Sequence, residues 1–414
     1  MNDRLRETQT TPIGLAELLA QYQPGSTLFA SPRRSLLAHG IEAVLPACRK
    51  DQLAARAAAM LEEARKHSWH LPVLMGAVPF QADAPARLVL PGQVYLGAGA
   101  AGQVLQTVAM PVSAKGMPAV LRMEPTPDEY RRNVALALSR IAENDMEKVV
   151  LSRSLTLAAS VDVATLLQRL ASRNAHGYTF AVDLPGMAGE RRTLLGASPE
   201  LLLARHGREV SSHPLAGSIP RSADPVEDQR RAQGLLQSEK DLHEHALVVD
   251  AVADALRPYC RGLHVPAAPS LVATPTMWHL GTEVRGELDD PATSSLTLAL
   301  ALHPTPAVCG HPTQAAHRFI DEQEGFDRSF FTGLVGWCDA NGDGEWAVTI
   351  RCAEVGEQTA TLYAGAGVVA GSDPELELRE TAGKLRTMLN AMGLEMIELD
   401  KNLGDLVGAV EQGA

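Results

Sequence analysis

The chain has 414 residues, of which 45% are hydrophobic and 21% are charged, and its formal net charge at pH 7 is −12. This composition allows a large apolar core without disulfides or structural metals, whereas the acidic balance and scattered Lys and Arg residues exclude nucleic acid as a partner. No window approaches the roughly 18 apolar residues of a membrane span. Because the global field repels anions, an anionic substrate would need local cations or a metal.

The cysteines and the first residues indicate the compartment. The five cysteines are scattered without C-x-x-C spacing, which argues against a zinc site or a disulfide framework and favours a reducing environment. The first residues lack the apolar stretch of a signal peptide. We therefore expect a cytoplasmic protein. Pattern alone cannot separate an exposed apolar stripe from core, so a monomer is our default expectation.

Residues 1–120 mix short apolar runs with Pro and Gly, for example at 29–32 and 71–76, a pattern typical of strands joined by turns. One Ala-rich helix is predicted over 49–66. No chemistry-bearing residues gather here. We interpret 1–120 as an N-terminal scaffold within a single domain, 121–392 as the catalytic core and 393–414 as a C-terminal tail.

Three helix starts organise the core. A capping box over 126–129, with Pro at the first helical position, predicts a helix to about 143. Asp224-Pro225 begins a pattern with apolar positions every seven residues until Pro258, which predicts one long amphipathic helix. Asp373-Pro374 begins a third helix, to about 391.

Strands are predicted between these helices, over 148–157, 346–353 and 359–369. In the first, alternation puts Lys148 on the face opposite Val149 and Leu151. Antiparallel runs of strands mixed with helices predict an α/β (α+β) fold.

Two motifs imitate metal sites. The segment 339–344 resembles the start of a calcium loop, but Ile350 stands where the loop needs Glu, so its Asn-Gly pair indicates a hairpin turn. His243 and His245 are two residues apart on a helix and do not face each other, which argues against joint chelation.

Several acids and bases could carry chemistry. Lys148 and Glu200 could form a base and acid pair, if burial tunes their pKa values; the alternative is that both lie exposed on a sheet. Glu244 and Glu380 lie on different helices and could together bind Mg²⁺, an ion that prefers oxygen ligands; the alternative for Glu380 is a solvated pair with Lys384. The Gly-Ala-Gly segment 365–367 could let backbone N–H groups approach an anion, or could form a bend needed for packing.

Taken together, these segments closely resemble the chorismate-utilising enzymes, and within them the siderophore-type isochorismate synthases. The resemblance extends over about residues 120–392. Its blocks are KVVLSR at 148–153, GASPE at 196–200, PLAGS at 214–218, SEKDLHEH at 238–245, TPTMWHL at 274–280, HPTPA at 303–307, GWC at 336–338, TIRCA at 349–353, GAG at 365–367, and RET at 379–381 with Lys384.

The resemblance implies a single large domain of two stacked antiparallel sheets with helices packed outside, and chorismate as the substrate. It implies that Lys148 activates water, that Glu200 protonates the departing hydroxyl, and that Glu244 and Glu380 bind Mg²⁺. The implied substrate contacts are Gly217, Ser218, His279, Ala307, Arg351, Gly365, Gly367 and Lys384. With Mg²⁺, Arg351 and Lys384 would supply the local positive charge that a dianion needs.

The implied activity is addition of water at ring carbon 2 of chorismate with loss of the carbon 4 hydroxyl. Ammonia-using relatives such as anthranilate synthase do not have lysine at the base position. Salicylate synthases, which go on to eliminate pyruvate, tend to carry a bulkier hydroxylated residue where Ala307 stands, although Val308 replaces a usual leucine and could loosen the pocket. A non-catalytic chorismate-binding subunit is the third alternative. The product could supply catecholate siderophores through 2,3-dihydroxybenzoate, which we favour, or salicylate or menaquinone.

Overall fold

The computed structural model describes residues 12–67, 72–106, 108, 118–186, 190–394 and 397, so most of the proposed tail at 393–414 lies outside the described residues. The helices of this part are α1 (Leu15–Ala20), α2 (Lys50–Lys66), α3 (Pro127–Ala142), α4 (Val163–Arg173), α5 (Pro225–Gln237), α6 (Glu239–Leu256), α7 (Ser295–Leu302), α8 (Thr313–Gln323) and α9 (Pro374–Met392). None of the helices in these ranges is long and apolar enough to cross a membrane.

The strands account for most of the remaining described chain. They are β1 (Thr27–Ala30), β2 (Arg34–Val44), β3 (Val73–Val78), β4 (Arg87–Ala98), β5 (Val120–Glu124), β6 (Lys148–Ala158), β7 (Tyr178–Leu184), β8 (Arg192–Ser198), β9 (Leu201–His206), β10 (Glu209–His213), β11 (Leu215–Pro220), β12 (Cys260–His264), β13 (Ser270–Ala273), β14 (Met277–Gly281), β15 (Val284–Leu288), β16 (Gly310–His311), β17 (Leu334–Asp339), β18 (Gly344–Val348), β19 (Cys352–Val355) and β20 (Thr359–Val369).

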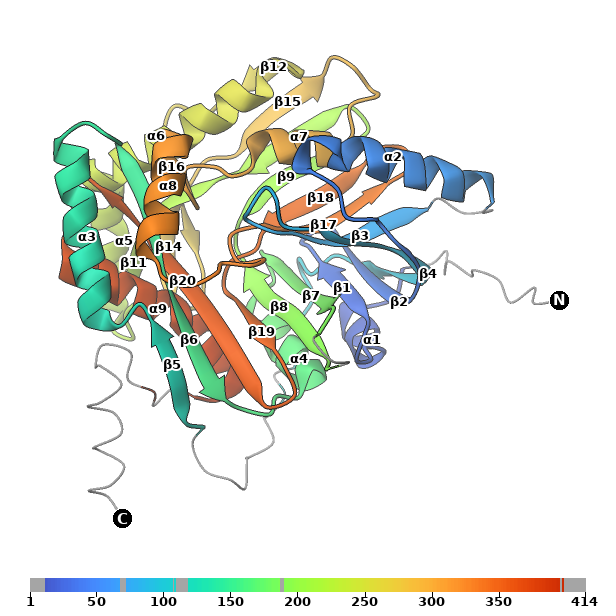
Figure 1. Cartoon of the computed structure of the whole chain (residues 1–414), viewed down its shortest axis with the longest axis horizontal. Helices are drawn as coiled ribbons and strands as arrows, with labels where there is room; N and C mark the ends of the chain where they lie inside the picture. The colour runs from blue at the N-terminus through green and yellow to red at the C-terminus, as the bar shows by residue number, and fades with distance from the viewer. Residues whose placement is uncertain are drawn as a thin grey trace.

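These strands form one large curled sheet and a small one. In the described residues the large sheet has 17 strands, and β11, β14 and β13 form the small sheet. The named strands pair antiparallel throughout. In Figure 1 the long strands β6 and β20 lie on one side of the molecule, and β3, β4, β17 and β18 on the other. The predicted fold class is confirmed. The large sheet is one continuous hydrogen-bonded network of strands.

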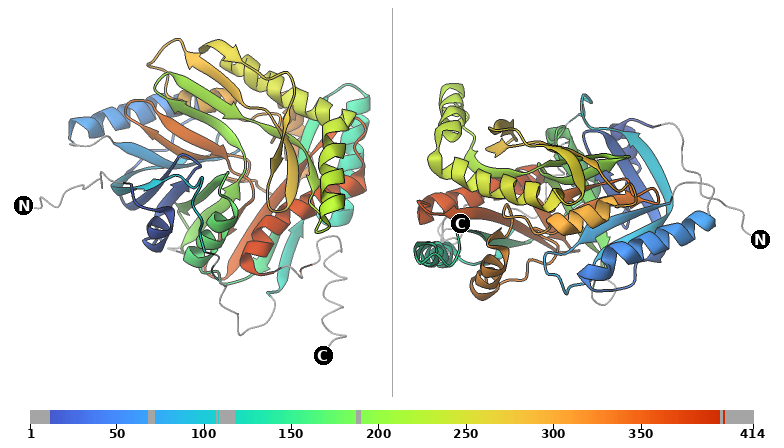
Figure 2. Two further views of the ribbon diagram at one scale, coloured as in Figure 1. Left: turned by 180° about the vertical axis from the view of Figure 1, so that it is seen from behind. Right: turned by 90° about the horizontal axis from the view of Figure 1, so that it is seen from above.

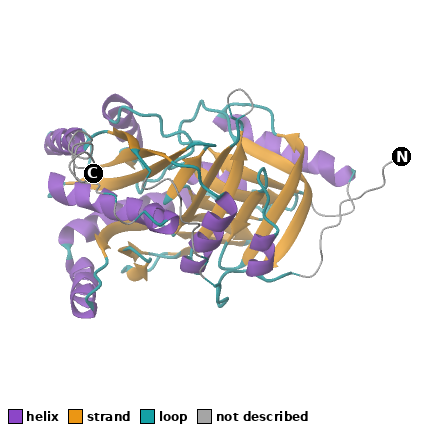
Figure 3. Cartoon of the chain, turned by 90° about the horizontal axis from the view of Figure 1, so that it is seen from below, coloured by secondary structure: helices purple, strands orange, loops and turns teal. Residues whose placement is uncertain are grey.

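Helices cover the outer faces of the sheets. Helices α3 and α9 pack on β20 and α8 packs on β6, while α5 and α6 pack on the small sheet (Figure 2). Figure 3 shows the helices flanking the strands. The N-terminal segment shares this core, because Leu15 and Leu28 pack in the same buried apolar cluster as Leu155, Leu195 and Leu385.

Several local predictions are confirmed. The helix expected over 49–66 is α2, and the capping box at Thr126 and Glu129 begins α3 with both of its reciprocal hydrogen bonds. The Asn341-Gly342 turn joins β17 to β18, and Gly342 has the positive φ, +86°, that this turn requires. All five cysteines are free thiols.

The prediction of a single long helix from Pro225 to Pro258 is wrong, because the helix is interrupted at Ser238. This residue ends α5 and caps α6, with an extended ψ of 109° and a side chain that accepts the N–H of Asp241. Serine favours such a cap over a helix interior because its hydroxyl satisfies a free backbone donor. The break gives α6, which carries Glu244, its own direction.

The strand expected over 346–353 is also interrupted. Strand β18 ends at Val348 and β19 begins at Cys352, and between them Arg351 adopts a left-handed backbone with φ of 51°. Conversely, the bend considered for 365–367 is wrong, because both glycines lie inside β20, opposite Ser152 and Val150 of β6. The glycine at position 367 is needed for a different reason, since a Cβ there would collide with Glu244.

Candidate active site

One pocket gathers almost every residue singled out from the sequence. Its space is about 610 Å³ including its mouth, and its walls come from both sheets, from α6 and α9, and from the loops at 307–308, 331–332 and 350–351. The predicted residues on its lining are Glu200, Gly217, Ser218, Glu244, His279, Ala307, Arg351, Gly365, Gly367, Glu380 and Lys384. Lys148 lies directly behind this lining and reaches it through Glu244.

Lys148 and Glu244 form a buried ion pair. Lys148 is the first residue of β6, is fully buried, and its Nζ lies 2.9 Å from Oε1 of Glu244 on α6. Burial alone would raise the pKa of Glu244, but the charges of Lys148 and Lys240 hold that pKa below its usual value. Gly367 makes room for the pair, since a Cβ at this position would lie 2.1 Å from Oε1 of Glu244.

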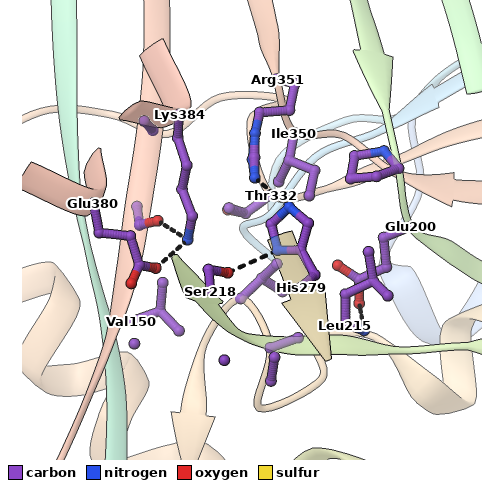
Figure 4. A pocket seen from close by; sticks show the side chains of 18 of the residues that line it. Val150, Glu200, Leu215, Ser218, His279, Thr332, Ile350, Arg351, Glu380 and Lys384 are labelled. Carbon is purple, nitrogen blue, oxygen red and sulfur yellow. Dashed lines mark hydrogen bonds and ion pairs between the residues drawn. The ribbon is translucent and has the colours of Figure 1, made fainter. Parts of the chain in front are cut away.

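Glu200 lies in the turn between β8 and β9 and is only 3% exposed. Burial raises the pKa of its carboxyl from 4.5 to about 7, against the lowering effect of a backbone N–H and of nearby cations. The N–H is that of Leu215, which donates to Oε1 at 3.5 Å (Figure 4). The alternative that Lys148 and Glu200 lie exposed on a sheet is therefore wrong, and Glu200 exchanges a proton near neutral pH.

A hydrogen-bonded chain runs from Arg351 through His279 to Ser218 (Figure 4). Nη2 of Arg351 donates to Nε2 of His279 at 3.1 Å, and Nδ1 of His279 lies 2.7 Å from Oγ of Ser218. Burial, Arg351 and Lys384 together lower the pKa of His279 well below its usual value, so the ring is neutral. Because guanidinium only donates, Nε2 is an acceptor and Nδ1–H donates to Ser218. The hydroxyl proton of Ser218 is therefore available to a bound molecule.

The remaining cations of the pocket are Arg351 and Lys384. Burial lowers the pKa of Arg351 to about 10, so it stays charged at neutral pH. Nζ of Lys384 lies 2.7 Å from Oε1 of Glu380, one turn earlier on α9, and donates to the Gly365 carbonyl at 2.7 Å. Both side chains of this pair are only 14% exposed and both line the pocket, so the solvated pair considered from the sequence is wrong.

Sequence reasoning missed the pair formed by Lys240 and Glu377. Glu377 is 1% exposed, and Nζ of Lys240 lies 2.7 Å from its Oε1. Burial and the charge of Glu380 raise the pKa of Glu377 to about 7 despite the opposing effect of Lys240. The signal was the spacing of Glu377, Glu380 and Lys384 on one face of α9, which indicated a shared face but not its burial.

Two carboxylates of the pocket could hold a magnesium ion. Glu244 from α6 and Glu380 from α9 both line the pocket and bring carboxylate oxygens from two different helices to it. Within the ranges that the structure describes, no three His, Cys, Asp or Glu side chains are arranged as a preformed metal centre. This arrangement suits Mg²⁺, which usually takes one or two protein carboxylates and completes its shell with water and substrate.

Comparison with known proteins identifies the family. The model of the chorismate binding enzyme family matches residues 101–393, well over half of the chain. The chain belongs to the chorismate-binding enzymes. Its membership confirms the resemblance seen in the motif blocks.

Two curated relatives match along nearly their whole length. The chain is 53% identical over 388 residues to isochorismate synthase DhbC of Bacillus subtilis, covering 92% of this chain and 96% of that protein. It is 41% identical over 388 residues to isochorismate synthase EntC of Escherichia coli K12, covering 91% and 97%.

Solved structures agree with the fold. DhbC of Bacillus anthracis, assigned as a 2,3-dihydroxybenzoate-specific isochorismate synthase, superposes with a TM-score of 0.86 at 49% identity, covering 91% of this chain and 99% of that one. Anthranilate synthase component I of Streptococcus pneumoniae superposes with a TM-score of 0.60 at 19% identity, covering 94% and 95%, which shows a common fold alone.

Proposed function

We propose that the protein is an isochorismate synthase, which converts chorismate to isochorismate. The observation that carries the proposal is one pocket lined by a buried glutamic acid whose pKa is about 7, with a buried lysine directly behind the lining and paired with Glu244. Near-whole-length identity to two isochorismate synthases supports the same conclusion.

Lys148 and Glu200 have the chemistry for the two proton transfers. Lys148 takes a proton from water as the water oxygen bonds to ring carbon 2, and the ring double bonds shift. Glu200 gives its proton to the hydroxyl as the bond from carbon 4 to oxygen breaks, so the hydroxyl leaves as water. Each transfer by a positioned group is worth roughly 10²–10⁴ in rate. Because an ammonium cannot accept a proton, Lys148 acts as the base in its neutral form.

The other side chains of the pocket are suited to bind the substrate. Arg351 is suited to hold one carboxylate of the dianion with two parallel hydrogen bonds, and Lys384 offers a second positive charge. The free hydroxyl proton of Ser218, together with the backbone at Gly217, Gly365 and Gly367, offers further donors. A Mg²⁺ ion held by Glu244 and Glu380 would supply positive charge for a substrate carboxylate.

The relatives favour one downstream use of the product. DhbC of Bacillus anthracis is described as specific for 2,3-dihydroxybenzoate, so we propose that isochorismate feeds 2,3-dihydroxybenzoate and a catecholate siderophore, rather than salicylate or menaquinone. A monomeric state and a cytoplasmic location stay predictions.

Product analysis tests the proposal. Purified protein is incubated with chorismate, with and without Mg²⁺ and with ammonium as a control, and the products are separated and identified by mass. We expect isochorismate, formed only with Mg²⁺. Salicylate with pyruvate would instead show a salicylate synthase, which Ala307 argues against, and absence of turnover with detectable chorismate binding would show a non-catalytic subunit.

A further inference from the structure

Directly behind one wall of the pocket lies a buried arginine that does not touch the pocket itself. Arg328 follows α8, is 3% exposed, and is absent from the pocket lining. Its guanidinium packs against the ring of Phe80, 4.6 Å from the ring centroid, and lies 5.9 Å from that of Phe331. A cation in such surroundings requires a full set of partners.

Every N–H of this guanidinium has an acceptor. A guanidinium has five donors, and two of those in Arg328 go to the carboxylate of Glu324, one of them from Nε to Oε2 at 2.7 Å. Glu324 is itself 2% exposed, and its Oε1 also accepts the backbone N–H of Ser152 on β6 at 2.7 Å. The ion pair is thus anchored to the strand that begins with Lys148.

The other three hydrogen bonds go to three residues that line the pocket. Nη2 donates to the carbonyl of Val150 at 2.8 Å, and Nη1 donates to the carbonyl of Val308 at 2.8 Å and to Oγ1 of Thr332 at 3.2 Å. Val150 lies on β6, Val308 follows Ala307, and Thr332 has a left-handed φ of 61°. One side chain therefore joins three separate parts of the chain into a single wall.

The two cations suited to bind anions are held by contacts other than those of Arg328. Arg351 precedes β19 and Lys384 lies on α9, and neither is hydrogen-bonded to Arg328. Loosening the wall would leave these binding groups intact while changing where the ring lies relative to Lys148 and Glu200. A displacement of about 1 Å can lower the rate of a positioned reaction by about 100-fold.

We propose that Arg328, with Glu324, is a positioning residue that sets the orientation of the substrate ring, a role that rests on the proposed function. It acts through the backbone of Val150 and Val308 and through the side chain of Thr332, without contact to the substrate. Its loss lowers kcat and leaves KM nearly unchanged, because the anion-binding groups keep their places.

The test compares two buried arginines. R328K keeps a positive charge beside Glu324, which avoids an unpaired buried carboxylate, but a lysine has three donors in place of five. R205K is the matched control, because Arg205 is also 3% exposed and donates to the carbonyls of Gly207, Asn341 and Pro291, none of which lines the pocket. Steady-state kinetics with chorismate and melting temperatures are measured for wild type and both variants.

We expect kcat of R328K to fall about 10-fold to 100-fold, with KM within about threefold of the wild-type value. R205K should keep kcat within about twofold of wild type, even if its melting temperature falls as much as that of R328K. A folded R328K with wild-type kcat, or equal losses of kcat in both variants, would overturn the positioning role. If R328K does not fold, E324Q is measured in its place. The same fall in kcat is expected, and a wild-type kcat would contradict the positioning role of Arg328 and Glu324. A wild type that makes no isochorismate overturns the proposed function itself.

Discussion

Replacing Glu200 with glutamine tests whether burial sets the proton affinity of this carboxyl. In the folded protein its pKa is about 7, against an ordinary 4.5. Between these values the folded state binds a proton that the unfolded state has released, so stability falls as the pH rises through this window. One pKa unit corresponds to 1.36 kcal/mol, so the ionised carboxyl costs the fold about 3 kcal/mol above pH 7.

Glutamine has the same shape and no charge, so E200Q escapes this cost. We expect E200Q to be more stable than wild type by about 3 kcal/mol at pH 8 and by only about 1 kcal/mol at pH 5, measured by urea unfolding at both pH values. E209Q is the matched control, because Glu209 is exposed on β10. If E200Q were less stable than wild type at pH 8, or if its advantage did not grow with pH, desolvation would not be the cause of the shift.

The same variant should lose activity. A general acid must carry its proton, so kcat of the wild type should fall as the pH rises above about 7, and E200Q should lose roughly 10²–10⁴ in kcat with no such fall remaining. If E200Q gains stability and loses kcat, the buried carboxyl of Glu200 serves the reaction at a cost to the stability of the fold.

Three further changes test the rest of the site. K148A should lower turnover by roughly 10²–10⁴ while circular dichroism shows a folded protein, and near-native turnover would refute the base assignment. G367A would bring a Cβ to 2.1 Å from Oε1 of Glu244, so calorimetry should show Mg²⁺ binding weakened about 10-fold or more, and an unchanged Kd would argue against Glu244 as a ligand. Chelation of Mg²⁺ should abolish isochorismate formation and added Mg²⁺ should restore it, which unchanged turnover in chelator would contradict.

The parts of the fold predicted best are those specified by local chemistry. The capping box at Thr126 and the Asp373-Pro374 pair each began a helix where expected, because cap and first-turn residues act within a few positions along the chain. The same local logic applied to Ser238 would have found the break between α5 and α6, but the seven-residue apolar repeat continues across it. The apolar repeat predicts which face of a helix is buried, but it does not show where the helix axis changes direction.

Burial at the site could not be predicted from pattern, because it depends on contacts between distant segments. Lys148 is fully buried because α6 brings Glu244 against it, and Gly367 is small because β20 must admit that carboxylate. Alternation along β6 indicated a face for Lys148 but not that both faces of the strand are covered. The family resemblance supplied these residues as a set, and the structure shows why their sizes and charges suit one another.

The charges of the pocket give a physical reason to expect a divalent cation. Lys148 is paired with Glu244, and Lys384 with Glu380, which leaves Arg351 as the cation without a hydrogen-bonded carboxylate among the described residues that line or adjoin the pocket. Glu200 adds up to one negative charge near neutral pH. The site therefore presents a net charge between zero and +1 to a dianion, inside a chain of −12. A divalent ion held by Glu244 and Glu380 would raise this net charge by up to two, and the pocket would then attract the substrate that the rest of the molecule repels.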